Sequence, residues 1–171
     1  VKAVFPPTKL HKFCFFHGDV SKYHQKLKNQ IVEGTKAFGM FVEIVFEKYR
    51  LAFNDGVNIR LLEPDNTPKD YQLLIEFTDG FLLVFTVSMY GGIALHNGNY
   101  DNEYYLKSQK AISPFSSDFE KYYLQILEES NLNLSVKAFL ATEQRFPGLG
   151  NGTLQDILFR AKINPKRKIG S

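Results

Sequence analysis

The sequence has a single cysteine, Cys14, among its 171 residues. One thiol excludes a disulfide within the chain, and it also excludes a zinc site built only from cysteines. The four histidines show no metal-ligand spacing among themselves, and they are His11, His17, His24 and His96. We therefore expect no metal site and no cofactor within this chain.

Tryptophan and long apolar runs are also missing. No apolar stretch approaches the roughly 18 residues that a membrane span needs, and nothing resembles a signal peptide. The sequence thus predicts an intracellular protein, cytoplasmic and associated with a bacterial nucleoid or otherwise inside the cell, which has no membrane partner and is a monomer. A hydrophobic content of 44%, with 16 Phe and nine Tyr, is sufficient for a buried core and suits β-sheet packing.

A net positive charge is missing from most of the chain and is found only at its end. The segment 135–171 holds seven basic and two acidic residues, whereas the rest holds 14 basic and 16 acidic residues. A basic surface of this kind favours contact with the phosphates of a nucleic acid. A solvated basic tail is the alternative interpretation.

The first hundred residues have the pattern of short β-strands separated by turns. Asn54-Asp55-Gly56 lies between the apolar segments 50–53 and 57–62, and Thr78-Asp79-Gly80 lies between two further apolar segments. Both turns predict hairpins. A further short strand is expected at Met89–Leu95, where Met89 and Tyr90 would pack as sheet residues. This spacing predicts an antiparallel sandwich.

The composition changes after about Gly98, where helical patterns replace strand patterns. Ser117-x-x-Glu120 reads as a capping box ahead of a helix that runs to about Ser130. The sequence therefore predicts an α+β fold with two domains. Residues 1–100 form a β-sandwich that lacks its first elements, and residues 101–171 form a helical DNA-binding domain.

A helix, a tight turn and a second helix are expected in the segment 135–161. Ser135 is a plausible N-cap for the first helix, which Pro147 would end. Gly148 and Gly150 would allow positive φ in the turn. The residues that repeat at helical spacing in the second helix are Leu154, Ile157, Leu158 and Ala161.

Asn151 would stand at the start of the second helix. Unpaired backbone N–H groups and the helix dipole favour an anion at this position, and a DNA phosphate is one such anion. A purely structural role in the turn is the alternative, because asparagine also favours caps and left-handed backbone.

The segment 135–167 resembles the helix–two-turn–helix of the formamidopyrimidine-DNA glycosylase and endonuclease VIII family. That family has a Lys on the first helix, then V-x-G-[IL]-G-N, a helix ending in E-[IL]-L-F-x-[AS], and [IV]-x-P-x-[RK]. The matching residues are Lys137, Gly148-Leu149-Gly150-Asn151, Asp156 in place of the family's acid, Ile157-Leu158-Phe159, Ala161, Ile163, Pro165 and Arg167. Weaker similarity extends to Gly39–Phe46, Thr86–Gly91 and Ser113–Phe119.

The resemblance implies damage recognition in base excision repair by a bifunctional DNA glycosylase and AP lyase, with double-stranded DNA, especially damaged DNA, as the partner. It implies phosphate contacts from Asn151 and Lys137 and close approach of the turn to DNA. The remaining implied DNA-binding residues are Gly148, Gly150, Arg145 and Arg167. Met89 or Tyr90 could enter the duplex as an uncharged wedge.

The sequence departs from the family at three places. The family's N-terminal Pro-Glu nucleophile is not in this sequence, so we assign no catalytic residue. Met40 stands where the family has a phosphate-binding lysine, and Ser88-Met89 stands where it has two arginines. The family's C-terminal zinc finger, or its zincless substitute, is also not included, so a structural zinc is expected only in longer members.

Three interpretations therefore stay open. The chain is an incomplete piece of an active glycosylase, a related module that binds damaged DNA without catalysis, or an unrelated interaction domain with a coincidental helix pair. The third interpretation predicts no salt-dependent binding of DNA.

Overall fold

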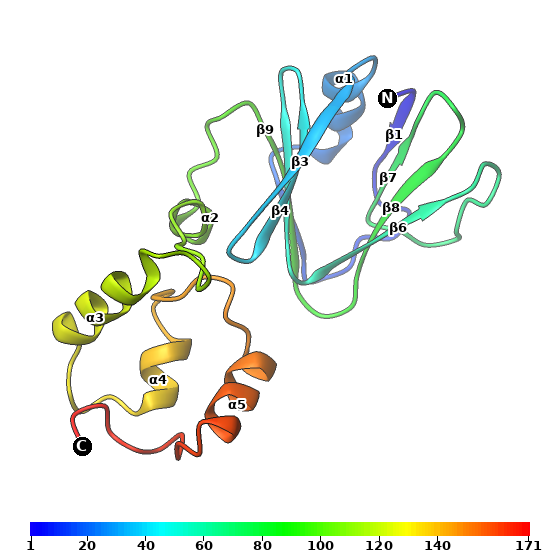
Figure 1. The fold of residues 1–171 in the computed structure, drawn as a ribbon. Coiled ribbons are helices and arrows are strands. Elements are labelled where there is room, and N and C mark those ends of the chain that lie inside the picture. Colours follow the sequence, from blue (N-terminus) through cyan, green and yellow to red (C-terminus); the bar gives the residue numbers. More distant parts are fainter. The chain divides into compact units, whose positions relative to one another are not determined.

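The computed structural model describes all residues, Val1–Ser171. The strands are β1 (Ala3–Phe5), β2 (Cys14–His17), β3 (Val32–Phe38), β4 (Phe41–Phe46), β5 (Arg50–Asn54), β6 (Val57–Leu62), β7 (Leu73–Glu76), β8 (Leu82–Val87) and β9 (Gly91–His96). The helices are the 3-10 turn η1 (Val20–Lys22), α1 (Tyr23–Leu27), α2 (Glu103–Gln109), α3 (Phe119–Glu129), α4 (Val136–Ala141) and α5 (Asn151–Arg160). Figure 1 shows their order along the chain.

The chain divides into two compact units. The sheet unit comprises residues 1–37 and 41–100, and the helical unit comprises residues 38–40 and 101–171. The three residues at the tip of the β3–β4 hairpin thus group with the helices. The α+β class predicted from the sequence is confirmed.

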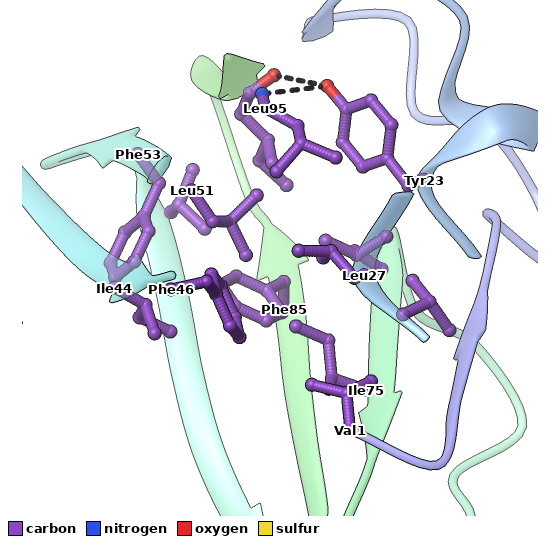
Figure 2. Close-up of a cluster of buried hydrophobic side chains, with 14 of the residues drawn as sticks. Val1, Tyr23, Leu27, Ile44, Phe46, Leu51, Phe53, Ile75, Phe85 and Leu95 are labelled. Carbon is purple, nitrogen blue, oxygen red and sulfur yellow. Dashed lines mark hydrogen bonds between the residues drawn. The ribbon is translucent and has the colours of Figure 1, made fainter. Parts of the chain in front are cut away.

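Two sheets build the sheet unit. One has the strand order β1-β7-β8-β6, and the other has the order β2-β9-β5-β4-β3. Apolar side chains alternate along the strands, so each sheet contributes an inner face to one shared core. Figure 2 shows this core, in which Phe46 and Leu51 of one sheet and Phe85 of the other are fully buried.

Tyr23 of α1 closes one end of this core. Its ring is buried, and its hydroxyl donates to the carbonyl of His17 at 2.8 Å and accepts from the N–H of Leu95 at 3.1 Å. Burial raises the pKa of Tyr23 to about 12. Because the hydroxyl has these partners, α1 is fixed against β9 without an unsatisfied polar group on the tyrosine.

The pairing of the strands corrects two expectations. The turn at Asn54–Gly56 is no hairpin, because β5 pairs with β4 and β9 while β6 pairs with β8 in the other sheet. The chain thus passes from one sheet to the other at this turn. The Asn54 side chain stabilises the turn, because its oxygen accepts from the N–H of Gly92 at 3.0 Å and from that of Gly56 at 3.3 Å. In addition, β2 runs parallel to β9, so the sandwich is not wholly antiparallel. The hairpin at Thr78–Gly80 is confirmed by the pairing of β7 with β8.

Helix boundaries in the helical unit also differ in part from the expectations. Ser135 caps α4 as expected, accepting from the N–H of Ala138 at 3.2 Å. However, α4 ends at Ala141, six residues before Pro147, and α3 is capped by Asp118 without a side-chain hydrogen bond. The expected capping box is therefore wrong.

Five aromatic rings form the core of the helical unit. The rings lie 5.5–6.5 Å from their neighbours and come from α3, α4 and the turn before α5. They belong to Phe119, Tyr122, Tyr123, Phe139 and Phe146. Phe146 contacts the other four rings, and Phe139 is fully buried. None of the helices has both the length and the apolar character that a membrane crossing requires.

Candidate nucleic-acid interface

The N-terminus of α5 is open to solvent. Gly150 occupies the N-cap position and has no side chain to satisfy the first N–H groups of the helix, and Asn151 is the first helical residue. Asn151, Gly152 and Thr153 are all exposed. Free N–H groups at the positive end of a helix, next to an exposed amide side chain, can bind a phosphate.

The turn that presents this terminus is held by close backbone packing. Gly148 has a φ of +93°, and a Cβ placed there would lie 2.7 Å from the carbonyl oxygen of Gly39. Gly39 itself has a φ of +52° and packs against Ser108 of α2. Only glycine fits at these two positions. In contrast, Gly150 has a φ of −77°, so the expectation of positive φ there is wrong.

Arg145 lies in the same turn, and its side chain bonds other residues of that turn. The guanidinium bonds the carbonyl and hydroxyl of Thr142 at 3.1 Å and the carboxylate of Glu143 at 2.7 Å. Its side chain is 12% exposed. These bonds indicate that Arg145 stabilises the turn.

Lys137 lies beside the basic segment 165–168, although about thirty residues of sequence separate them. The N–H of Val136 donates to the carbonyl of Arg167 at 2.8 Å, and the N–H of Lys137 donates to the carbonyl of Pro165 at 3.1 Å. A bridge between Ser135 and Lys168 continues this pairing. The structure thus brings Lys137 and Arg167 together in one basic surface.

The segment 135–171 keeps a net positive charge after its ion pairs are counted. The two acidic residues of the segment 135–171 are each paired with an arginine, Glu143 with Arg145 and Asp156 with Arg160. The other five basic residues have no Asp or Glu partner, and they are Lys137, Lys162, Lys166, Arg167 and Lys168. All five are exposed, and the side chains of Lys168 and Arg167 also donate to the carbonyls of Asn133 and Ser171. Their uncompensated charge favours contact with a polyanion.

Met89 and Tyr90 lie in the bend between β8 and β9. Their side chains are 73% and 58% exposed, so the expectation that they pack as sheet residues is wrong. Strand β9 starts only at Gly91. The ring of Tyr90 stacks on that of Phe13 at 4.5 Å, a contact that sequence reasoning missed because the two residues lie far apart in the chain.

The sheet unit also contains a buried ionisable pair. Nε2 of His96 lies 3.5 Å from Oε1 of Glu43, and both side chains are almost fully buried. Burial lowers the pKa of His96, and the carboxylate of Glu43 opposes this effect. Burial also raises the pKa of the Cys14 thiol to about 11, which makes it a poor nucleophile.

Curated relatives point to one family. The chain is 28% identical over 159 residues to a formamidopyrimidine-DNA glycosylase of Shouchella clausii, covering 90% of this chain and 56% of the relative. It is 25% identical over 157 residues to the enzyme of the same name from Bacillus cereus, with the same coverage. The chain is thus similar in sequence to formamidopyrimidine-DNA glycosylases over most of its length. No established family model matches the sequence.

Solved structures of formamidopyrimidine-DNA glycosylases share the fold. A Lactococcus lactis Fpg in complex with DNA containing an abasic site has a TM-score of 0.78 and 18% identity over 100% of this chain and 63% of that chain. MutM in complex with DNA containing carbocyclic 8-oxo-G has a TM-score of 0.70 and 20% identity over 88% of this chain and 59% of that chain. The chain spans about half the length of the curated formamidopyrimidine-DNA glycosylases that it matches.

Proposed function

We propose that this chain binds the phosphate backbone of double-stranded DNA and recognises damaged DNA in base excision repair. The observation that carries the proposal is the open N-terminus of α5 with its exposed Asn151, in the segment 135–171, which also holds five basic residues without an acidic side-chain partner. The structures with the same fold were solved with DNA that contains an abasic site or a lesion.

Each residue of the interface has a separate role in this proposal. Asn151 and the first N–H groups of α5 bind one phosphate, while Lys137 and Arg167 neutralise others. Gly148 lets the turn pack on Gly39, and Gly150 leaves space for close approach of the DNA. Arg145 acts indirectly by holding the turn in shape.

The reaction that we propose for the natural protein is that of the relatives, namely removal of a damaged base followed by strand cleavage. The alternative is a relative that binds damaged DNA without catalysis. Met40 favours this alternative, because a thioether cannot bind a phosphate or transfer a proton as the family's lysine does. Met89 also favours it, or favours an altered range of lesions, since it replaces a cationic residue.

Borohydride trapping tests the reaction. The N-terminal residue of the natural polypeptide is first determined, and the protein is then reduced with borohydride in the presence of a duplex that contains one abasic site. A covalent adduct through a terminal proline amine supports the glycosylase and lyase reaction, because the iminium ion that a secondary amine forms with C1′ of the sugar is reduced by borohydride to a stable amine. Binding without an adduct supports the non-catalytic alternative.

A further inference from the structure

We propose that Asn151 is a site of spontaneous deamidation, and that conversion of its side chain to a carboxylate ends phosphate binding at the N-terminus of α5. The proposal rests on the proposed function, because it assigns a chemical change to the residue that would hold the phosphate. Asparagine followed by glycine favours this reaction, since glycine has no side chain to hinder its backbone nitrogen. The chain contains this dipeptide at residues 97–98 and at residues 151–152.

The reaction needs no enzyme and no cofactor. The backbone nitrogen of Gly152 loses its proton and attacks Cγ of Asn151, which closes a succinimide ring and expels the side-chain nitrogen as ammonia. Water then opens the ring at either carbonyl and leaves aspartate or isoaspartate. Both products carry a negative charge where a neutral amide stood. The reaction therefore requires a backbone N–H on the glycine that is not held in a hydrogen bond.

The fold distinguishes Gly152 from the other glycines that follow an asparagine or an aspartate. Gly98 donates its N–H to Nδ1 of His96 at 3.1 Å. Gly56 and Gly80 donate theirs to oxygens within their own turns. The N–H of Gly152 has no such acceptor, because it is one of the first N–H groups of α5. Its nitrogen is therefore the one available for attack.

The surroundings of Asn151 also leave room for the ring to close. Asn151 and Gly152 are both exposed. No atom lies within 4 Å of the place where a Cβ would stand on Gly150 or on Gly152. A helix resists this reaction in its interior, because the main chain has to rotate at the asparagine. Asn151 is the first residue of α5, and helix ends fray.

A carboxylate at this position reverses the electrostatics of the site. It would compete with a phosphate for the N–H groups of α5 and repel the phosphate as well. We expect Asn151→Asp, which reproduces one product, to lower the affinity for duplex DNA by roughly tenfold, because a like-charge repulsion adds to the lost hydrogen bond. An acidic residue in the first turn stabilises a helix, so the thermal midpoint of this variant should not fall.

The rate of deamidation is measured on the parent chain without DNA, at mildly alkaline pH. Mass spectrometry of the peptides that contain Asn151 and Asn97 follows the replacement of the amide NH2 by OH. We expect Asn151 to react faster than Asn97 in the folded chain. In the chain unfolded with urea the two should react at similar rates, because only the fold distinguishes them.

Gly152→Ala provides a second comparison. Its methyl group should slow the reaction at Asn151, because it hinders the attacking nitrogen, and it meets no other atom of the fold. The rate at Asn97 should stay that of the parent chain. If Asn97 reacts as fast as Asn151 in the folded parent, or if Asn151→Asp binds DNA as tightly as the parent, the proposal is overturned.

Bound DNA should protect Asn151. A phosphate that accepts from the N–H of Gly152 gives this group the partner that Gly98 already has, so a saturating duplex should slow the reaction at Asn151 and leave Asn97 unchanged. Binding of DNA without this protection would contradict the placement of a phosphate at Asn151. If the parent chain binds no DNA, the proposed function fails, whereas the rates in the free chain still decide whether Asn151 is the reactive site.

Discussion

At the scale of single residues, Asn151 contributes most directly to the proposed interface. Asn151→Ala removes a side-chain contact to a phosphate, so we expect the affinity for DNA to fall roughly fivefold, in line with about 1 kcal/mol for one hydrogen bond. The loss should be equal on duplexes of unrelated sequence, because phosphates carry no sequence information.

Fluorescence anisotropy with two labelled duplexes measures this effect. Gln155→Ala is the control, since Gln155 is exposed on the same helix but lies one turn beyond its N-terminus. An unchanged affinity in Asn151→Ala, or a loss confined to one sequence, would show that Asn151 only shapes the turn.

The buried His96 predicts how stability depends on pH. Because burial lowers the pKa of His96 in the folded chain, the unfolded chain binds its proton more readily. The free energy of unfolding should therefore fall as the pH drops through the ordinary histidine range near ~6.5. The other groups around the ring are Glu43, His17, Tyr100 and Arg50.

Thermal melting of the parent chain and of His96→Gln between about pH 7.5 and about pH 5.5 tests this prediction, because this interval spans the ordinary histidine pKa. The parent should lose more of its thermal midpoint on acidification than the variant does, whatever the variant's own stability at neutral pH. Equal losses in the two proteins would mean that another group controls the acid sensitivity.

At the scale of elements, local signals predicted those features that depend only on neighbouring residues. The cap of α4 by Ser135 and the hairpin at Thr78–Gly80 are both confirmed. The turn at Asn54–Gly56 has an equally strong hairpin signal, yet it carries the chain from one sheet to the other. Its asparagine bonds Gly92, which lies 38 residues away, and no local pattern reveals such a partner.

The turn before α5 provides a matched pair of glycine substitutions. Gly148→Ala forces a side chain into left-handed backbone and against the carbonyl of Gly39, so we expect a loss of at least about 1–2 kcal/mol of stability. DNA binding should weaken with it, because the turn positions Asn151. Gly150→Ala should be neutral or slightly stabilising, because its φ is ordinary and no atom lies within 4 Å of the added Cβ.

Chemical denaturation and DNA binding of both variants are measured together. Equal stability of the two proteins would contradict the packing of Gly148 on Gly39. A stable Gly148→Ala variant that binds DNA with the affinity of the parent chain would show that the turn does not contribute to the interface.

At the scale of the whole molecule, the sequence predicted the α+β class, the similarity to formamidopyrimidine-DNA glycosylases and the basic end of the chain. These features follow from the order and the composition of the residues, which can be read directly from the sequence. The sequence did not reveal that Lys137 pairs through its backbone with the segment 165–168, nor that Phe13 supports Tyr90. Both contacts join residues far apart in the chain, and only the folded backbone brings them together.

The most direct test of the central claim is the salt dependence of DNA binding by the 171-residue chain. If the exposed basic residues of the helical unit bind phosphates, log affinity should fall linearly with log salt, with a slope of roughly −3 to −5. Lys137→Gln should make this slope shallower by about one. An absence of binding at low salt, or an affinity that does not change with salt, would contradict the assignment of this chain as a DNA-binding protein.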